Sequence, residues 1–394
     1  MEINKKIKVL RMIAMLNIGG PTINAVLLTG GLDKERFESM LVVGRISESE
    51  GDMSYFARDR NIEPVVIPQL RREIDPIADV IAFYKIYKLI LKFQPDIIHT
   101  HTAKAGTLGR AAAILFNLLH RKKIKLVHTF HGHVLSGYFN KFFTYIFLGI
   151  EKILAKFTDR IIAISETLKS NILSLQIGNS DKIKVVHLGF ELDKFYDIPL
   201  RVDNDLTIGI VGRLVSIKNH RMLLDVIRLM LDKQMLQAGQ RFSIIGDGEL
   251  KDELKRYVDK LGIADKVNFF GWQNDLVKVY RDIDIVALTS INEGTPVSLI
   301  EALASSRPVI ATDVGGVRDI IGEKLYPEIS DRGILVKSND INGFADGLSL
   351  LLKNRQLRHS LGASGRQFVQ SEFNNKRLIK NTEMVYNAVL NCRS

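Results

Sequence analysis

The chain has 394 residues, 46% of them apolar and 25% charged, with a net charge of +11. This length allows two domains that each bury a core, and the composition is that of a soluble globular protein. The only cysteine, Cys392, excludes an internal disulfide and a cysteine-based metal site, which suits a reducing cytoplasm. No apolar run approaches the roughly 18 residues that a membrane-spanning helix needs.

The first half of the chain alternates apolar strands with helical segments. Its basic, then apolar, N-terminus superficially resembles a signal peptide. Lys8 and Arg11 interrupt the apolar run and no small-residue cleavage site follows, so we predict a first strand there. A helix is predicted over DPIADVIAFYKIYKLILKFQ, with Asp75 as its cap and Pro76 in its first turn. Strands are predicted at IKVLRMIAML, SMLVVGR, PVVIP, DIIHTHT, KLVHTF, RIIAIS and KIKVVHLG.

The alternation restarts near residue 206. Further strands are predicted at LTIGIVGR, RFSIIGDG, KVNFFGW, DIVALTS, PVIATDV and GILVK. So many strands would be abnormal in one sheet, so we predict an α/β protein with two doubly wound, Rossmann-like domains built on parallel sheets. The predicted boundaries are 1–198, a linker over 199–206, a second domain over 207–375 and a C-terminal helix over 376–394. Ligands of such sheets bind beyond the carboxyl ends of the strands, so we expect the domains to face each other across a cleft.

Two strand ends carry residues that suit a phosphate ligand. Gly20 follows the first strand and lets backbone N–H groups come close to a ligand, although an ordinary strand-to-helix turn explains it about as well. Arg213 and Lys218 follow the strand that ends at Gly212. A planar guanidinium and a mobile ammonium suit a diphosphate, whereas the simpler alternative is two exposed loop cations. The Walker pattern GxxxxGK[ST] does not occur.

A third strand end lies in EGTPVSLIEALASSR. Thr295 and Pro296 are predicted as cap and first residue of a short helix, whose free N–H groups at 295–298 would form an anion site. Glu293 and Glu301 flank that site. Carboxylates repel phosphate but suit neutral hydroxyls, one set on a sugar ring and one on a ribose. The plain alternative is that Glu301 caps or pairs on a helix face.

Histidines concentrate in one segment of the first half. In DIIHTHT, His99 and His101 share one strand face, which makes a metal site conceivable. No carboxylate in the segment could complete or orient such a site, so we predict no bound metal and favour cleft-lining or structural imidazoles. His131, followed by Gly132, is the best candidate for a ligand contact. The five clustered histidines are His99, His101, His128, His131 and His133.

The same region contains no acidic residue between Asp96 and Glu151. This gap predicts a positive face that favours an anionic partner, although a solvated basic face is the simpler reading. The aromatic-rich helix YFNKFFTYIFLGIEKILAKF at 138–157 fits a core helix or a helix resting on an anionic bilayer equally well. The basic residues of the gap are Lys104, Arg110, Arg121, Lys122, Lys123, Lys125 and Lys141.

Taken together, these motifs resemble the family 4 glycosyltransferases, which are retaining, nucleotide-sugar-dependent enzymes of the GT-B architecture. HTHTAKAGTLGR and TFHGHVLSGYF resemble bacterial members that build polysaccharides or lipid-linked oligosaccharides. The resemblance implies that Arg213 and Lys218 hold the donor diphosphate and that Gly20 approaches it from the other domain. It further implies the roles of the remaining candidates: Glu293 with the backbone of Gly294, Thr295, Pro296 and Val297 holds sugar and phosphate, Glu301 binds ribose, and His131 contacts the sugar.

The resemblance also implies the reaction and its partners. We expect a hexose or N-acetylhexosamine donor that is UDP-linked by family habit, with no metal because the Asp-x-Asp motif of metal-dependent transferases is absent. Front-face attack by the acceptor hydroxyl would retain configuration. A lipid-linked or glycan acceptor is expected at the inner face of the cytoplasmic membrane, where the protein would bind peripherally, and no nucleic acid is expected. The alternatives are a nucleotide-sugar 2-epimerase and a non-catalytic sugar-nucleotide-binding protein.

Overall fold

The computed structural model describes residues 5–46, 51–71, 73, 75–132, 141–200 and 205–391, and the side chains of all of these except 141–143. The chain divides into two compact units. The first contains Met1–Phe190 together with Asn374–Ser394, and the second contains Glu191–Phe373. His133, part of the segment 138–157 and part of the predicted linker lie outside the described residues.

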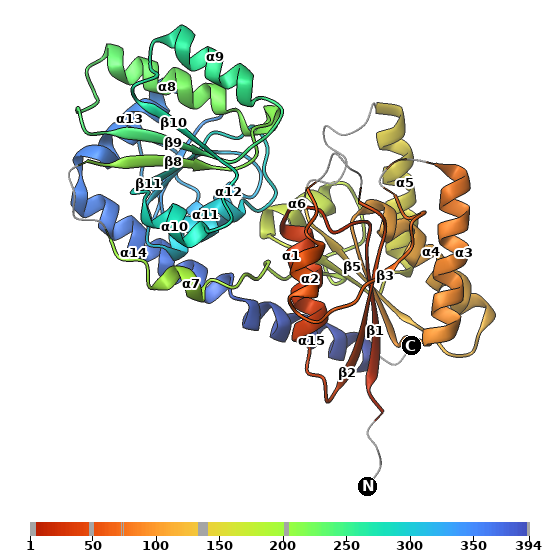
Figure 1. The fold of residues 1–394 in the computed structure, drawn as a ribbon. Coiled ribbons are helices and arrows are strands. Elements are labelled where there is room, and N and C mark those ends of the chain that lie inside the picture. The colour runs from red at the N-terminus through yellow and green to blue at the C-terminus, as the bar shows by residue number, and fades with distance from the viewer. Residues whose placement is uncertain are drawn as a thin grey trace. The chain divides into compact units, whose positions relative to one another are not determined.

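The first unit is built on a parallel sheet with the strand order β3-β2-β1-β4-β5-β6-β7. Its strands are β1 (Ile7–Ile13), β2 (Phe37–Val43), β3 (Val65–Val66), β4 (Ile97–His101), β5 (Lys125–Phe130), β6 (Arg160–Ala163) and β7 (Ile183–Val185). Its helices are α1 (Gly20–Gly31), α2 (Ser54–Arg58), α3 (Pro76–Phe93), α4 (Ala103–Leu119), α5 (Lys141–Phe157), α6 (Glu166–Ser174) and α15 (Asn375–Asn391). Helices α1 and α15 pack together on one face of this sheet. On the opposite face, α4 packs against both α3 and α5 (Figure 1).

The second unit repeats this plan with the strand order β10-β9-β8-β11-β12-β13. Its strands are β8 (Thr207–Val211), β9 (Arg241–Ile245), β10 (Val267–Gly271), β11 (Ile285–Leu288), β12 (Val309–Thr312) and β13 (Ile334–Val336). Helix α8 packs against α9 and α13, and α11 packs against α14 (Figure 1). The helical elements are α7 (Asp193–Tyr196), η1 (Ser216–Lys218), α8 (His220–Asp232), α9 (Lys251–Leu261), α10 (Leu276–Arg281), α11 (Val297–Ala304), α12 (Val317–Ile321), α13 (Ile341–Lys353) and α14 (Arg355–Glu372).

Both sheets are buried between helices, which explains the apolar strands. The central strands β4 and β11 are buried at every position, as β-branched runs in doubly wound sheets require. The predicted cap of α3 is also present, because the Asp75 side chain accepts a hydrogen bond from the Ala78 N–H. Every strand predicted from the sequence occurs, and the prediction of two doubly wound α/β domains is confirmed.

The boundary between the units differs from the predicted one. Residues 191–198, predicted to close the first domain, belong to the second unit. The reason is packing: Phe195 of α7 is buried with its ring 5.6 Å from that of Tyr280, and Arg366 donates a hydrogen bond to the Tyr196 carbonyl. At the other end, α15 lies in the first unit, where its Tyr386 hydroxyl accepts a hydrogen bond from Arg11 of β1.

Candidate functional site

Three loops of the second unit meet beyond the carboxyl ends of β8, β11 and β12. The Thr289 hydroxyl, just after β11, donates to the carbonyl oxygens of Lys218 and Asn219 at 3.2 and 3.0 Å. On the other side, the Thr312 hydroxyl of β12 donates to the Ser290 carbonyl at 2.6 Å. Residues far apart in the sequence are therefore held in one cluster, at the sheet edge where ligands of parallel sheets bind.

Lys218 and Glu293 form the charged centre of this cluster. The Lys218 ammonium lies 2.6 Å from Glu293 Oε1, and the Ser290 hydroxyl donates to the same oxygen at 2.6 Å. The side chains of Lys218 and Glu293 are only 23% and 9% exposed, so solvent screens this ion pair less than it screens a pair on the protein surface. A ligand phosphate could compete with Glu293 for the ammonium, while the carboxylate remains available to a hydroxyl donor.

The Gly315-Gly316 pair after β12 sets the position of the Glu293 loop. A Cβ atom on Gly316 would lie 1.9 Å from the Gly294 carbonyl oxygen, and the Gly316 N–H donates to the Glu293 carbonyl at 3.2 Å. Gly315 has φ +51°, in the left-handed region that glycine adopts without strain. Only a residue without a side chain allows the backbone at position 316 to come this close to the Gly294 carbonyl, so this glycine pair positions the loop that contains Glu293.

A second glycine pair, which our sequence analysis did not single out, supports the Arg213 loop. Gly246 and Gly248 follow β9 in the stretch GDGE. A Cβ on Gly246 would lie 1.9 Å from the Gly212 carbonyl oxygen, and the Leu214 N–H donates to the Asp247 carbonyl at 2.9 Å. Two glycines that flank a polar residue directly after a predicted strand indicate a close backbone approach, and this pattern is present in the sequence.

Helix α11 starts one residue later than predicted. Its first residue is Val297 and its cap is Pro296, so the prediction of Thr295 as cap is wrong. The Pro296 backbone is extended, with ψ 105°, which delays the first helical turn. None of the described residues accepts a hydrogen bond from the N–H groups of Gly294, Thr295 or Val297. These free donors and the positive end of the helix still form an anion-binding arrangement beside Glu293.

Glu301 lies in different surroundings from Glu293. It is half-buried on α11, and its Oε2 accepts a hydrogen bond from the Tyr280 hydroxyl at 3.0 Å. Burial raises the pKa of Glu301 to about 7, although the Tyr280 hydrogen bond and the Lys194 charge act in the opposite direction. Near neutral pH this carboxyl can therefore accept or donate a hydrogen bond. Arg213, in contrast, is exposed in the loop just after β8.

The two remaining candidates, Gly20 and His131, lie in the first unit. Gly20 is the first residue of α1, and a Cβ atom there would lie 3.0 Å from Leu188 Cδ1. His131 directly follows β5, and its Nε2 lies 2.8 Å from His101 Nδ1. His99 and His101 do share one strand face, with ring centroids 4.3 Å apart.

His99, His101 and His128 are buried and His131 is half-buried, and this burial favours the uncharged form of each ring. Burial lowers the pKa of His131 to about 3 and holds the pKa values of His99, His101 and His128 well below the ordinary range. Among the described residues, no group of three or more His, Cys, Asp or Glu side chains could hold a metal ion. The rings instead bond to one another and to hydroxyl groups.

The acid-free segment does not give a uniformly positive face. Four of its cations pair with carboxylates from outside the segment, namely Lys104 with Asp79, Arg110 with Glu151, Lys122 with Asp96, and Lys125 with Asp159. The prediction overlooked these partners because they come from neighbouring helices and strand ends. No helix in the described part of the chain is both long and apolar enough to cross a bilayer.

Known proteins match this chain along most of its length. The sequence profile described as "Glycosyltransferase Family 4" matches residues 18–194, and the profile "Glycosyl transferases group 1" matches residues 193–368. A UDP-Gal:alpha-D-GlcNAc-diphosphoundecaprenol alpha-1,3-galactosyltransferase from Escherichia coli is 26% identical, with 91% of this chain and 92% of that protein aligned. The capsular polysaccharide biosynthesis glycosyltransferase CapM from Staphylococcus aureus is 27% identical, with 82% and 85% aligned.

The fold matches solved structures as well. HepE from Anabaena, crystallised with UDP, superposes with a TM-score of 0.77 at 18% identity, covering 98% of this chain and all of that one. At this identity the likeness concerns the fold, while the two profiles concern the family. The chain belongs to glycosyltransferase family 4 and is a glycosyltransferase of the GT-B type.

Proposed function

We propose that this enzyme transfers a hexose or N-acetylhexosamine from a UDP-sugar to a lipid-linked or glycan acceptor in cell-surface polysaccharide synthesis, with retention of configuration and without a metal ion. The main support is the pair of Lys218 and Glu293 beside the free N–H groups at the start of α11. The relatives in Escherichia coli and Staphylococcus aureus bear names from lipid-linked glycan and capsule synthesis, and HepE was crystallised with UDP.

In this proposal the second unit stabilises the leaving group. Departure of UDP places negative charge on the diphosphate, and Arg213, Lys218 and the amides before α11 supply positive potential there. Lys218 then turns from Glu293 to a phosphate oxygen. Positive side chains and a helix end provide the stabilisation that a metal ion gives in other transferases, so no metal is needed.

Carboxylates and first-unit residues position the rest of the donor. Glu293, held by Ser290, accepts a hydrogen bond from a hydroxyl of the transferred sugar, and Glu301 binds the ribose. From the first unit, Gly20 approaches the diphosphate and His131 contacts the sugar. The acceptor hydroxyl attacks from the face that UDP leaves, and the departing phosphate takes its proton, so configuration is retained.

A ligand panel and a product analysis test this function. UDP-, GDP- and ADP-sugars are compared for thermal stabilisation, and a UDP-sugar at a hundred times its Kd should add about 2.7 kcal/mol to stability. The enzyme is then incubated with the best donor alone. Slow release of UDP and free sugar supports a transferase, whereas an epimerised sugar nucleotide identifies an epimerase. Stabilisation by GDP- or ADP-sugars alone would contradict the UDP assignment.

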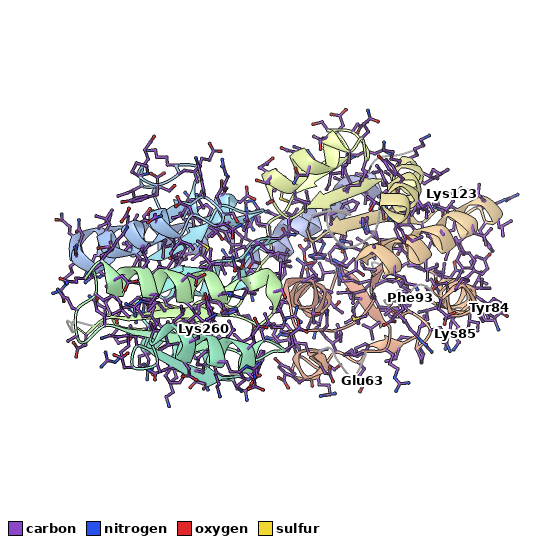
Figure 2. The ribbon with its side chains drawn as sticks, turned by 90° about the horizontal axis from the view of Figure 1, so that it is seen from above. Glu63, Tyr84, Lys85, Phe93, Lys123 and Lys260 are labelled. Atoms are coloured by element: carbon purple, nitrogen blue, oxygen red, sulfur yellow. The ribbon has the colours of Figure 1, made fainter. Side chains whose placement is uncertain are left out.

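We further propose that the first unit rests on the inner face of the cytoplasmic membrane. Apolar side chains are exposed along α3, where Ile77, Val80 and Tyr84 are 76%, 69% and 55% accessible. Their spacing forms one stripe, flanked by basic side chains. Tyr84 and Lys85 of α3, and Lys123 after α4, lie toward one end of the first unit (Figure 2). Exposed apolar and basic residues together suit an anionic bilayer.

Liposome binding tests this surface. The protein should sediment with anionic liposomes at low salt and less at high salt, because salt screens the attraction. Replacing Ile77 and Val80 by serine should weaken binding without changing hydrolysis of a soluble UDP-sugar. Replacing Phe270, an exposed apolar residue of the second unit, is the matched control. No binding of the wild type at low salt would refute the membrane proposal.

A further inference from the structure

The predicted sugar-contacting histidine does not stand alone. His131 Nε2 and His101 Nδ1 lie 2.8 Å apart, with ring centroids separated by 5.1 Å. His101 is the last residue of β4 and is fully buried, whereas His131 follows the adjacent strand β5. The strand register places Thr129 opposite His101, so His131 lies two residues beyond that pair, just after its strand ends.

His99, whose ring packs against that of His101, has both of its ring nitrogens in hydrogen bonds. Arg11 Nη2 donates to the Tyr386 hydroxyl at 2.7 Å, so the single proton of that hydroxyl is donated to His99 Nδ1 at 2.7 Å. Uncharged His99 then carries its proton on Nε2 and donates it to the Thr129 hydroxyl at 2.7 Å. Both nitrogens of His99 are thereby occupied, and His99 contributes only a stacked ring to His101.

One nitrogen of each ring in the His101–His131 pair has no such partner. His101 Nε2 and His131 Nδ1 are both buried atoms, and none of the described residues hydrogen-bonds to either. Because both rings are uncharged, the Nδ1···Nε2 contact contains one shared proton, and its location fixes which nitrogen of His131 carries a proton. A buried polar atom without a partner is costly, and of the two nitrogens only His131 Nδ1 belongs to a half-exposed ring, so it is the one that a ligand can reach.

We propose that His101 is a positioning residue for the transfer reaction: it occupies Nε2 of His131, fixes the tautomer and tilt of that ring, and leaves Nδ1 to bind a hydroxyl of the transferred sugar. The inference deepens the proposed function and rests on it. His101 itself touches no substrate in this scheme. Its role corresponds to that of a group that orients a catalytic imidazole through the opposite ring nitrogen.

Two substitutions at His101 separate positioning from packing. His101→Phe keeps a ring of similar shape but removes the hydrogen bond, whereas His101→Asn keeps an amide group near the place of Nδ1. We expect kcat for hydrolysis of UDP-galactose or UDP-N-acetylglucosamine to fall on the order of a hundredfold in His101→Phe and to recover largely in His101→Asn. Affinity for UDP itself should stay unchanged, because neither His101 nor His131 is among its proposed ligands.

The tautomer is read directly by NMR on protein labelled with ¹⁵N at histidine. In the wild type, His131 should show one protonated and one unprotonated ring nitrogen. In His101→Phe the two signals should move toward an average, while in His101→Asn they should stay distinct. The control is His99→Phe, on the same strand face and equally buried, which should lower stability but leave the His131 signals unchanged.

If His101→Phe does not fold, His131 itself gives the answer. The amide of asparagine lies where Nδ1 lies, and that of glutamine where Nε2 lies, so His131→Asn should retain more turnover than His131→Gln. The reverse order, or His131 signals in His101→Phe identical to those of the wild type, would overturn the inference. If the wild type hydrolysed no UDP-sugar, the proposed function would fail, while the ring-nitrogen measurement would still decide whether His101 positions His131.

Discussion

The two units hold their candidate residues in different ways. In the second unit, Lys218 and Glu293 lie in loops that follow neighbouring strands, and hydroxyl and glycine contacts fix those loops to one another. In the first unit, His131 lies within hydrogen-bond distance of His101, whose ring packs against that of His99. His99 in turn accepts a hydrogen bond from Tyr386 of the C-terminal helix. A site made of strand-end loops leaves a local signature in the sequence, whereas a site supported through a buried network does not.

The largest effect should come from breaking the charged centre of the second unit. Lys218→Ala and Glu293→Ala should each lower kcat for sugar transfer by about a hundredfold to a thousandfold, because each removes an interaction with charge or hydroxyls of the reacting donor. The folded state should persist, as judged by circular dichroism. Arg228→Ala removes an exposed ion pair with Asp232 on α8 and serves as the control that should keep full activity. Undiminished turnover in either site variant would refute its role.

Gly316→Ala tests whether the loop contacts themselves matter. The new Cβ atom would meet the Gly294 carbonyl oxygen at 1.9 Å, so the Glu293 loop must shift. We expect kcat to fall about tenfold to a hundredfold and stability to fall by about 1–3 kcal/mol. Gly149→Ala on α5 is the matched control, since a Cβ atom there has no neighbour within 4 Å. Equal kinetics for Gly316→Ala and wild type would mean that the glycine does not place Glu293.

The contrast between the units explains which predictions succeeded. Apolar strands and their turn residues are local patterns, and every predicted strand is present. The same holds for the strand-end motifs around Lys218 and Glu293, which converge because parallel strands end at one edge. The GDGE turn after β9 was readable in the same way.

Contacts between distant segments account for the errors. Tyr386 reaches His99 across 287 positions of sequence, and no periodicity indicates such a pair. The acid-free segment predicted a positive face, but four of its seven cations pair with carboxylates on neighbouring elements. Charge along the chain is therefore a poor guide to charge on the surface of a doubly wound domain. The division between the units at residue 190 was missed for a related reason, because Phe195 is held by a ring from a distant helix.

Tyr386→Phe tests the network of the first unit. Loss of the hydroxyl leaves Arg11 Nη2 and His99 Nδ1 without that partner, so we expect destabilisation of about 1–3 kcal/mol. Hydrogen exchange should show the loss in β4 and α15, with the second unit unaffected. Tyr257→Phe, which removes a hydroxyl bonded to Asp225 near the surface of the second unit, should cost less. Unchanged exchange in β4 and α15 would mean that this network does not hold α15 in place.

The smallest effect concerns the pH dependence of the second unit. Burial raises the pKa of Glu301 from 4.5 to about 7, so the folded protein keeps a proton that the unfolded chain releases. The resulting stability is fully present below pH 4.5 and is lost as the pH rises through about 7. Glu301→Gln cannot ionise and should escape that loss. The gain relative to wild type should be about 2 kcal/mol across this range, less than the full shift would give, because the side chain is only half-buried and solvent screens it. Denaturant midpoints measured against pH reveal it, with the exposed Glu253→Gln as control. If the stabilities of wild type and Glu301→Gln changed in parallel with pH, the pKa of Glu301 would be the same in the folded and the unfolded chain, which would contradict the raised pKa.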